Sequence, residues 1–224
     1  MASTIATGSV LLAGCLDELF DDEIEAASEP AAVDPAVVDS LGFEHLELDD
    51  FGIDETFEIG DETVSLSATS WVSMYGVEEF DPEAYGSDPS EIEDVDEEHL
   101  LGAAVISTPS ATFAGQEVNP AGWSDELDLV EQFDNELVDG GVDSIEQTDT
   151  IPITVLDESV ELSVFEADLA VDDVDDTVPV IVYLAIVELE DDFILPAGVH
   201  HRSVDAIDDL IELFEAIEYP VDSP

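Results

Sequence analysis

Sixty aspartate and glutamate residues stand against a single basic residue, Arg202, so the chain of 224 residues carries a formal net charge of −59 at pH 7. In dilute buffer these carboxylates repel one another and raise the energy of any compact state. At about 1 M salt the screening length falls to roughly 3 Å, and neighbouring carboxylates then scarcely interact. The composition therefore predicts a halophile's protein, which folds in concentrated salt with solvent cations around its acidic surface.

The apolar residues indicate a folded core rather than a disordered acidic chain. They make up 45% of the sequence and give a slightly positive mean hydropathy of +0.12. Valine, isoleucine and leucine also gather in periodic runs, as they do in packed strands and helices. Nucleic acids are excluded as partners because such a chain repels their phosphates, and phosphate ligands are disfavoured with one arginine available.

The N-terminal residues look like the end of a lipoprotein signal. Leu12, Ala13, Gly14 and Cys15 close an uncharged run that starts at Met1, and they have the order of a lipobox. Cys15 would then be the first residue of the mature protein, carry a lipid and hold the chain on the outer face of the cell membrane. The run lacks the basic residues with which a secretory signal begins, so we expect the true start upstream.

Cys15 is also the sole cysteine, which excludes an intramolecular disulfide and a cysteine-based metal site. The alternative is that Cys15 is a small buried apolar residue of a short N-terminal helix in a cytoplasmic protein. Residues 15–29 are acidic and suit an extended tether. Without its first 14 residues the chain still has 210, enough for one domain with a sizeable core, which we place at 30–224.

The hydrophobic pattern predicts an α+β domain with a mainly antiparallel β-sheet and helices packed on it, including a C-terminal helix. Helices are expected at 30–42 (Asp34 as N-cap, Pro35 in the first turn, Gly42 at the end), at 125–138 with Ser124 as N-cap, and at 204–217 with Ser203 as N-cap. Strands are expected at 43–49, 53–59, 63–74, 99–108, from 151 onward, at 178–189 and at 193–200.

Three finer predictions concern the sheet and its connections. Residues 76–98 are rich in acids and proline and read as an exposed insertion loop, and 109–122 reads as a further loop. The alternation of apolar residues changes phase at 164–165, which predicts a β-bulge there. Residues 178–189 are apolar on both faces, which is typical of a central strand covered on both sides.

Several short segments together resemble a family of haloarchaeal lipoproteins of unknown function. Besides the lipobox, they are Ser107-Thr108-Pro109 leading to Gly115-Gln116-Glu117-Val118-Asn119-Pro120, Val182-Tyr183-Leu184, Glu190-Asp191-Asp192-Phe193 and Gly198-Val199. The likeness covers most of residues 38–219. It implies an organism class and a location, and no activity, cofactor or site residue. The closing strands and helix are also similar to the ends of photosystem-accessory and nuclear-import-accessory domains, an analogy of fold alone.

The candidate site residues each have a structural interpretation that we favour. His200 and His201 are adjacent in a strand and point to opposite faces, so they are poorly placed to share a metal ion, and Arg202 is expected to pair with nearby acids. His45 and His99 are expected to be half-buried strand residues. The acidic run 172–176 could attract Ca²⁺ but lacks the EF-hand spacing, and is expected to be a solvated hairpin tip.

Trp71, Tyr75 and Trp123 could form the floor of a pocket for an apolar or sugar-like ligand, but aromatic residues in strands are more often core. No catalytic, cofactor-binding or metal residue is therefore predicted, and no cofactor. The first hypothesis is a non-catalytic, lipid-anchored extracytoplasmic module that binds or assists an envelope protein or a small ligand. The alternatives are a secreted hydrolase with a carboxylate-based site and a passive acidic envelope protein.

Overall fold

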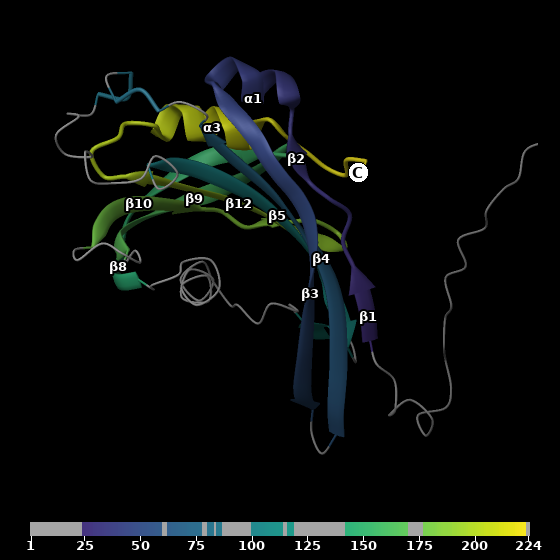
Figure 1. Cartoon of the computed structure of the whole chain (residues 1–224). Helices are drawn as coiled ribbons and strands as arrows, with labels where there is room; N and C mark the ends of the chain where they lie inside the picture. Colours follow the sequence, from purple (N-terminus) through teal and green to yellow (C-terminus); the bar gives the residue numbers. More distant parts are fainter. Residues whose placement is uncertain are drawn as a thin grey trace, which may run out of the picture.

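The computed structural model describes residues 24–59, 62–77, 80–82, 84–86, 100–113, 116–118, 142–169 and 177–222. Most of these residues form one strongly curved sheet, with helices α1 (Pro35–Leu41) and α3 (Ile207–Glu215) lying together at one end of the molecule (Figure 1). The lipobox Leu12–Cys15, the predicted helix 125–138, Trp123, His99 and the acidic run 172–176 fall outside the described residues.

The strands of the main sheet follow the order β1-β4-β5-β12-β10-β9-β8, and β11 also pairs with β12. β1 and β5 pair with successive parts of one edge of β4, at residues 66–69 and 71–76, and β3 pairs with its opposite edge. Their bounds are β1 Ile24–Ala27, β3 Phe43–Ile59, β4 Glu62–Val77, β5 Leu101–Pro109, β8 Val142–Val155, β9 Glu158–Leu169, β10 Val178–Leu184, β11 Val187–Glu188 and β12 Asp192–His201. The sheet is mixed because β1 runs parallel to β4, whereas its other described pairs are antiparallel. The predicted strand-rich fold with a C-terminal helix is thus confirmed, and the sheet is less uniform than expected.

The chain joins the sheet earlier than the predicted domain start at residue 30. Residues 24–27, expected to belong to the acidic tether, form β1 with Ile24 opposite Leu66 and Ala27 opposite Thr69. A crossing segment, α1 and β3 separate β1 from β4, which gives the chain room to return in a parallel pairing that a tight hairpin cannot make. Part of the expected tether is therefore a strand of the fold.

The two strands expected at 43–49 and 53–59 are one long edge strand, β3, with a bulge between His45 and Glu47. Acidic residues between them suggested a break, but charged side chains are tolerated on an edge strand and discourage pairing with another chain. The loop expected at 109–122 instead contains the strands β6 (Ala111–Phe113) and β7 (Gln116–Val118), which pair with each other.

The predicted bulge at 164–165 lies in the neighbouring strand. β9 pairs with β10 in unbroken register from Ser163 to Leu169, but β8 has an extra residue, Thr148, between the partners of Phe165 and Val164. Val164 and Phe165 are both buried because apolar clusters cover both faces of the sheet at this point. The phase change in the sequence thus records double burial rather than an irregular β9.

Residues 178–189 are interior, as predicted, although β10 ends at Leu184 and the chain resumes pairing as β11. The middle position of the sheet belongs to β12, which pairs with β5 on one side and with β10 and β11 on the other. Val180, Leu184, Ile194 and Leu195 are at most 1% exposed. These neighbouring strands supply much of the core.

Both described helices lie near their predicted positions. Asp34 caps α1 by accepting a hydrogen bond from the Ala36 amide, and Gly42 ends it with a φ of 76°, a left-handed conformation that favours glycine. The helix itself is shorter than predicted, because Ala32 and Val33 form strand β2 with β13 (Ile217–Glu218). α3 begins at Ile207 rather than at 204, and no side chain caps it.

The described part of the predicted insertion loop 76–98 is not wholly exposed. Phe80 is 9% exposed, and its ring stacks on that of Tyr85 with 5.2 Å between centroids. The carbonyl of Tyr85 accepts a hydrogen bond of 3.0 Å from the Asp205 amide just before α3. The segment therefore packs at the end of the molecule where the helices lie, and the rest of the predicted loop lies outside the described residues.

Candidate functional site

A buried polar cluster lies at the end of β12 and contains both histidines of the predicted pair. His200 and His201 are 4% and 5% exposed, and Tyr183 on β10 is 5% exposed. The Tyr183 hydroxyl lies 2.9 Å from His200 Nε2, and His200 Nδ1 lies 2.9 Å from the His201 carbonyl oxygen. A carbonyl can only accept, so Nδ1 carries the proton and Nε2 accepts from the tyrosine hydroxyl. Both ring nitrogens of a neutral His200 are thus satisfied.

His201 is held by different partners from those of His200, as expected for neighbouring residues of a strand. Its Nδ1 accepts a hydrogen bond of 3.2 Å from the Ser203 amide and lies 2.8 Å from the Ser203 hydroxyl. Ser203 therefore fixes the histidine ring instead of capping α3, which corrects the predicted role of that serine. No cluster of three or more metal-binding side chains occurs among the residues that the structure describes.

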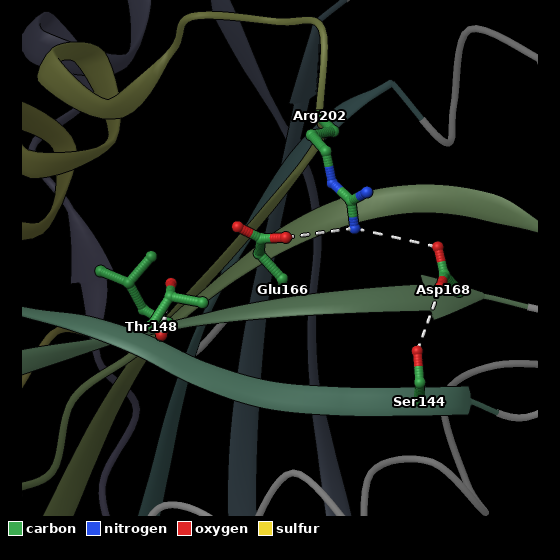
Figure 2. Close-up of polar contacts among 6 residues, drawn as sticks. Ser144, Thr148, Glu166, Asp168 and Arg202 are labelled. Carbon is green, nitrogen blue, oxygen red and sulfur yellow. Dashed lines mark hydrogen bonds and ion pairs between the residues drawn. The ribbon is translucent and has the colours of Figure 1, made fainter.

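Arg202 pairs with two acids of β9, as the sequence predicts. Its Nη2 lies 3.6 Å from Glu166 Oε2 and 3.8 Å from Asp168 Oδ1, and Asp168 also accepts a hydrogen bond of 3.0 Å from Ser144 on β8 (Figure 2). The three charged side chains are 40% to 48% exposed. Exposed pairs of this kind contribute little to stability. The only arginine of the chain thus lies on the surface and is shared between two carboxylates.

The burial of this cluster sets the protonation of its members. Burial lowers the pKa of His200 below its ordinary value of 6.5, although the backbone bond to His201 and the charge of Asp205 act in the opposite direction. Burial and then the charge of Asp205 raise the pKa of Tyr183 to about 12. At neutral pH the pair is therefore an uncharged, closed hydrogen bond, suited to a structural role.

We expect His200 to make the protein less stable as the pH falls. The folded state has the lower pKa, so its contribution is full above pH 6.5 and is lost as the pH drops through 6.5 toward the folded value. The free energy of unfolding of the wild type should decline over this window more steeply than that of His200→Gln, measured by urea denaturation at a series of pH values. Equal slopes would contradict the assignment.

The aromatic residues proposed as a pocket floor are structural in the described part of the chain. Tyr75 is 2% exposed, and its hydroxyl accepts a hydrogen bond of 2.8 Å from the Val33 amide. Trp71 is partly buried and donates from Nε1 to the Ser28 carbonyl at 3.2 Å. Both side chains thus contact the segment that crosses the sheet between β1 and α1, which confirms the interpretation as core and rim.

Two serines complete this set of contacts. Ser73 Oγ donates to the Ala31 carbonyl at 2.6 Å, and Ser107 Oγ on β5 donates to the Glu29 carbonyl at 2.7 Å. We call Trp71, Ser73, Tyr75 and Ser107 the N-terminal clamp, because together they bind the backbone of residues 28–33. In the sequence, alternation puts Ser73 and Tyr75 on the same face of this strand as Thr63, Ser65, Ser67 and Thr69, a polar pattern typical of a solvated face, yet Ser73 and Tyr75 are buried.

His45 is exposed rather than half-buried as predicted, because it lies at the bulge of an edge strand. Its ring lies beside that of Tyr75, with 5.2 Å between centroids. The large apolar side chains with the greatest exposure in the described part of the chain are also on this hairpin: Leu46 at 60%, Met74 at 39% and Phe51 at 37%. We call these three the apolar row.

Comparison with protein families finds a match over residues 30–218 to a domain of unknown function, DUF6517. The chain belongs to this family. The DUF6517 match begins within the clamped segment and ends at β13, so it includes the two described helices and all of the clamp side chains, while β1 precedes it. A search of curated proteins finds no match. None of the described helices is long and apolar enough to cross a membrane.

Proposed function

We propose that this DUF6517 protein is a lipid-anchored extracytoplasmic protein of a halophilic archaeon, and that it serves as a non-catalytic binding or accessory module of the cell envelope. Its location rests on the sequence Leu12-Ala13-Gly14-Cys15 and on the fold that begins only nine residues later, at Ile24. The single arginine against sixty acids supports the halophilic origin.

The apolar row is the observation that favours a binding role. Ser70, Val72, Met74 and Gly76 share a face of β4 by alternation, and Phe51 lies opposite Ser70. Leu46 Cδ1 lies 3.1 Å from the position that a Cβ on Gly76 would take, so it covers the same face. Apolar side chains gathered on one face of an edge hairpin, on a chain so rich in acids, are typical of a surface that meets another protein.

The polar cluster around His200 supports the non-catalytic assignment. Tyr183 and His200 are nearly inaccessible to solvent and each satisfies the other. A catalytic acid or base has to reach the atom whose proton it transfers, and this pair offers neither nitrogen nor hydroxyl to a substrate from outside. Its arrangement is that of a hydrogen bond that ties β10 to β12.

Replacing Cys15 tests the anchor. The gene, with its upstream sequence, is expressed in a haloarchaeal host as wild type, Cys15→Ser and the control Ser9→Ala. We expect wild type and control to stay in the membrane fraction through high-salt washes without detergent, because a lipid and not surface charge holds them. Cys15→Ser should be released or accumulate unprocessed. Recovery of all three proteins in the soluble cytoplasmic fraction would overturn the proposal.

A further inference from the structure

The N-terminal clamp holds the segment that leads from β1 toward α1 against the sheet. Residues 28–33 cross β4 and β5, and three side-chain donors bind three carbonyl groups of this segment: Trp71 to Ser28, Ser107 to Glu29 and Ser73 to Ala31. Ser28 in turn donates from its amide to the Thr69 carbonyl at 3.1 Å and from its hydroxyl to the Ser107 carbonyl at 3.0 Å.

The C-terminal end of the chain closes over the same segment. The Val221 amide donates to the Pro30 carbonyl at 2.9 Å, and β13 pairs with β2 so that Ile217 lies opposite Val33. Ala31 and Val33 are 1% and 3% exposed. The segment is therefore part of the core, and β1 is attached to the domain through a buried connection rather than through a free arm.

The direction of β1 shows from which side a tether reaches the domain. β1 is parallel to β4 and starts opposite Leu66, so the chain enters from the side of the β3–β4 turn, where Ile59 faces Glu62 (Figure 1). The hairpin continues past the start of β1 by four residues, or about 14 Å. In the opposite direction β4 runs eleven residues to Val77, or about 37 Å, where it meets the start of β3 beside α1.

We propose that the clamp fixes the orientation of the domain on the membrane, with the β3–β4 turn toward the lipid surface and the α1–α3 end away from it. The proposal rests on the proposed lipid anchor. Nine residues from Cys15 to Ile24 span at most about 30 Å when fully extended. The turn lies within this reach. Bringing α1 to the lipid would need the tether to run back along eleven residues of β4, or about 37 Å, which is more than its full length.

The clamp matters because it keeps the tether short. If residues 24–33 separated from the sheet, the length of chain between the lipid and the domain would roughly double and reach about 60 Å, and the domain could then turn over freely. With the clamp closed, the apolar row lies farther along the hairpin than Ile24, on the side away from the lipid, since Phe51 and Met74 align with positions beyond Leu66. A partner protein can reach it there.

Energy transfer to the membrane surface tests this orientation. The lipidated full chain is labelled with a donor fluorophore at Asp54→Cys on β3 or at Ser40→Cys on α1, both exposed positions, and is incorporated into vesicles of anionic diether phospholipid that contain an acceptor on the headgroup. Cys15 is the only native cysteine, and its thiol is blocked by the lipid, so each label has one site. We expect transfer to be clearly greater from position 54. Equal or reversed efficiencies would overturn the orientation.

A second comparison isolates the clamp. The triple variant Trp71→Phe, Ser73→Ala, Ser107→Ala loses the three donors to the crossing segment, and we expect it to lose the difference in transfer between the two labels. Ser70→Ala is the matched control, because Ser70 is also fully buried on β4 but donates to Thr108 Oγ1 and not to the segment. It should keep the difference. A triple variant that also keeps it would refute the role of the clamp.

Two further measurements separate failure of this inference from failure of the proposed anchor. Intact mass establishes the lipid on Cys15, and flotation of the vesicles establishes binding before any transfer is measured; a chain without lipid that does not float contradicts the anchor itself. Near-ultraviolet circular dichroism confirms that the triple variant remains folded. If it does not fold, the less disruptive Ser107→Ala variant is compared with Ser70→Ala in the same way.

Discussion

Transfer from concentrated salt to about 0.1 M salt is expected to unfold the protein, because the screening length rises from roughly 3 Å to roughly 10 Å. Two carboxylates 7 Å apart repel by about 0.6 kcal/mol in water without screening. A few tens of such pairs outweigh the roughly 5–15 kcal/mol by which a folded domain is stable. Among the described residues, the ion pairs of Arg202 with Glu166 and Asp168 offset little of this repulsion.

Circular dichroism during stepwise dilution of KCl measures the transition, and two controls identify its cause. Sucrose at low salt favours burial without screening charge, so it should not restore the fold if repulsion is responsible. Mild acid at low salt neutralises carboxylates, and it should restore part of the structure. A chain that keeps its fold and its thermal midpoint in dilute buffer would contradict the argument from charge and with it the proposed halophilic origin.

The elements that the sequence predicted well are those whose signals are local. Asp34, Pro35 and Gly42 mark the ends of α1 through their own backbone preferences, and the structure uses all three. β12 and α3 likewise follow from apolar periodicity within one segment. In each case the residues that decide the structure are a few positions apart.

The failures share a different cause, which is contact between residues far apart in the sequence. Ser73 and Tyr75 continue what reads as a solvated face, yet both are buried and form hydrogen bonds with the crossing segment, about forty residues earlier. Residues 24–27 read as tether in the sequence because their partners in β4 are some forty residues away. Leu156 and Asp157 turn β8 into β9 with φ values of 52° and 66°, a two-residue turn for which leucine gives no signal.

In the candidate site too, the features that depend on contacts distant in the sequence could not be predicted. An ion pair could be predicted for Arg202 from composition alone, because it is the only lysine or arginine among sixty acids. The Tyr183–His200 pair could not be foreseen, since it depends on the register that places β10 beside β12. The sequence signal that would have helped is the apolar character of both strands, which implies that any polar residue within them has a partner.

Phe214→Ala is expected to cost about 3–5 kcal/mol of unfolding free energy, as large aromatic truncations in a core do. Phe214 is completely buried on α3, and it lies against β12 at Gly198, where an added Cβ would come within 3.0 Å of its Cζ. The absence of a side chain at Gly198 lets the helix approach the sheet closely. Removing the ring therefore leaves a cavity at the centre of this contact.

The same contact predicts that added volume is destabilising too, and Gly198→Ala adds volume where Phe214→Ala removes it. A Cβ at Gly198 would meet Phe214 and also Leu210 at 3.1 Å, and overpacking of this kind costs about 1–3 kcal/mol. Phe51→Ala, at an exposed ring on the edge hairpin, is the control and should change stability little. Urea denaturation in concentrated KCl measures all three. If Phe214→Ala is no more destabilising than Phe51→Ala, α3 does not pack on the sheet as described, since a ring without close neighbours loses nothing when it is removed.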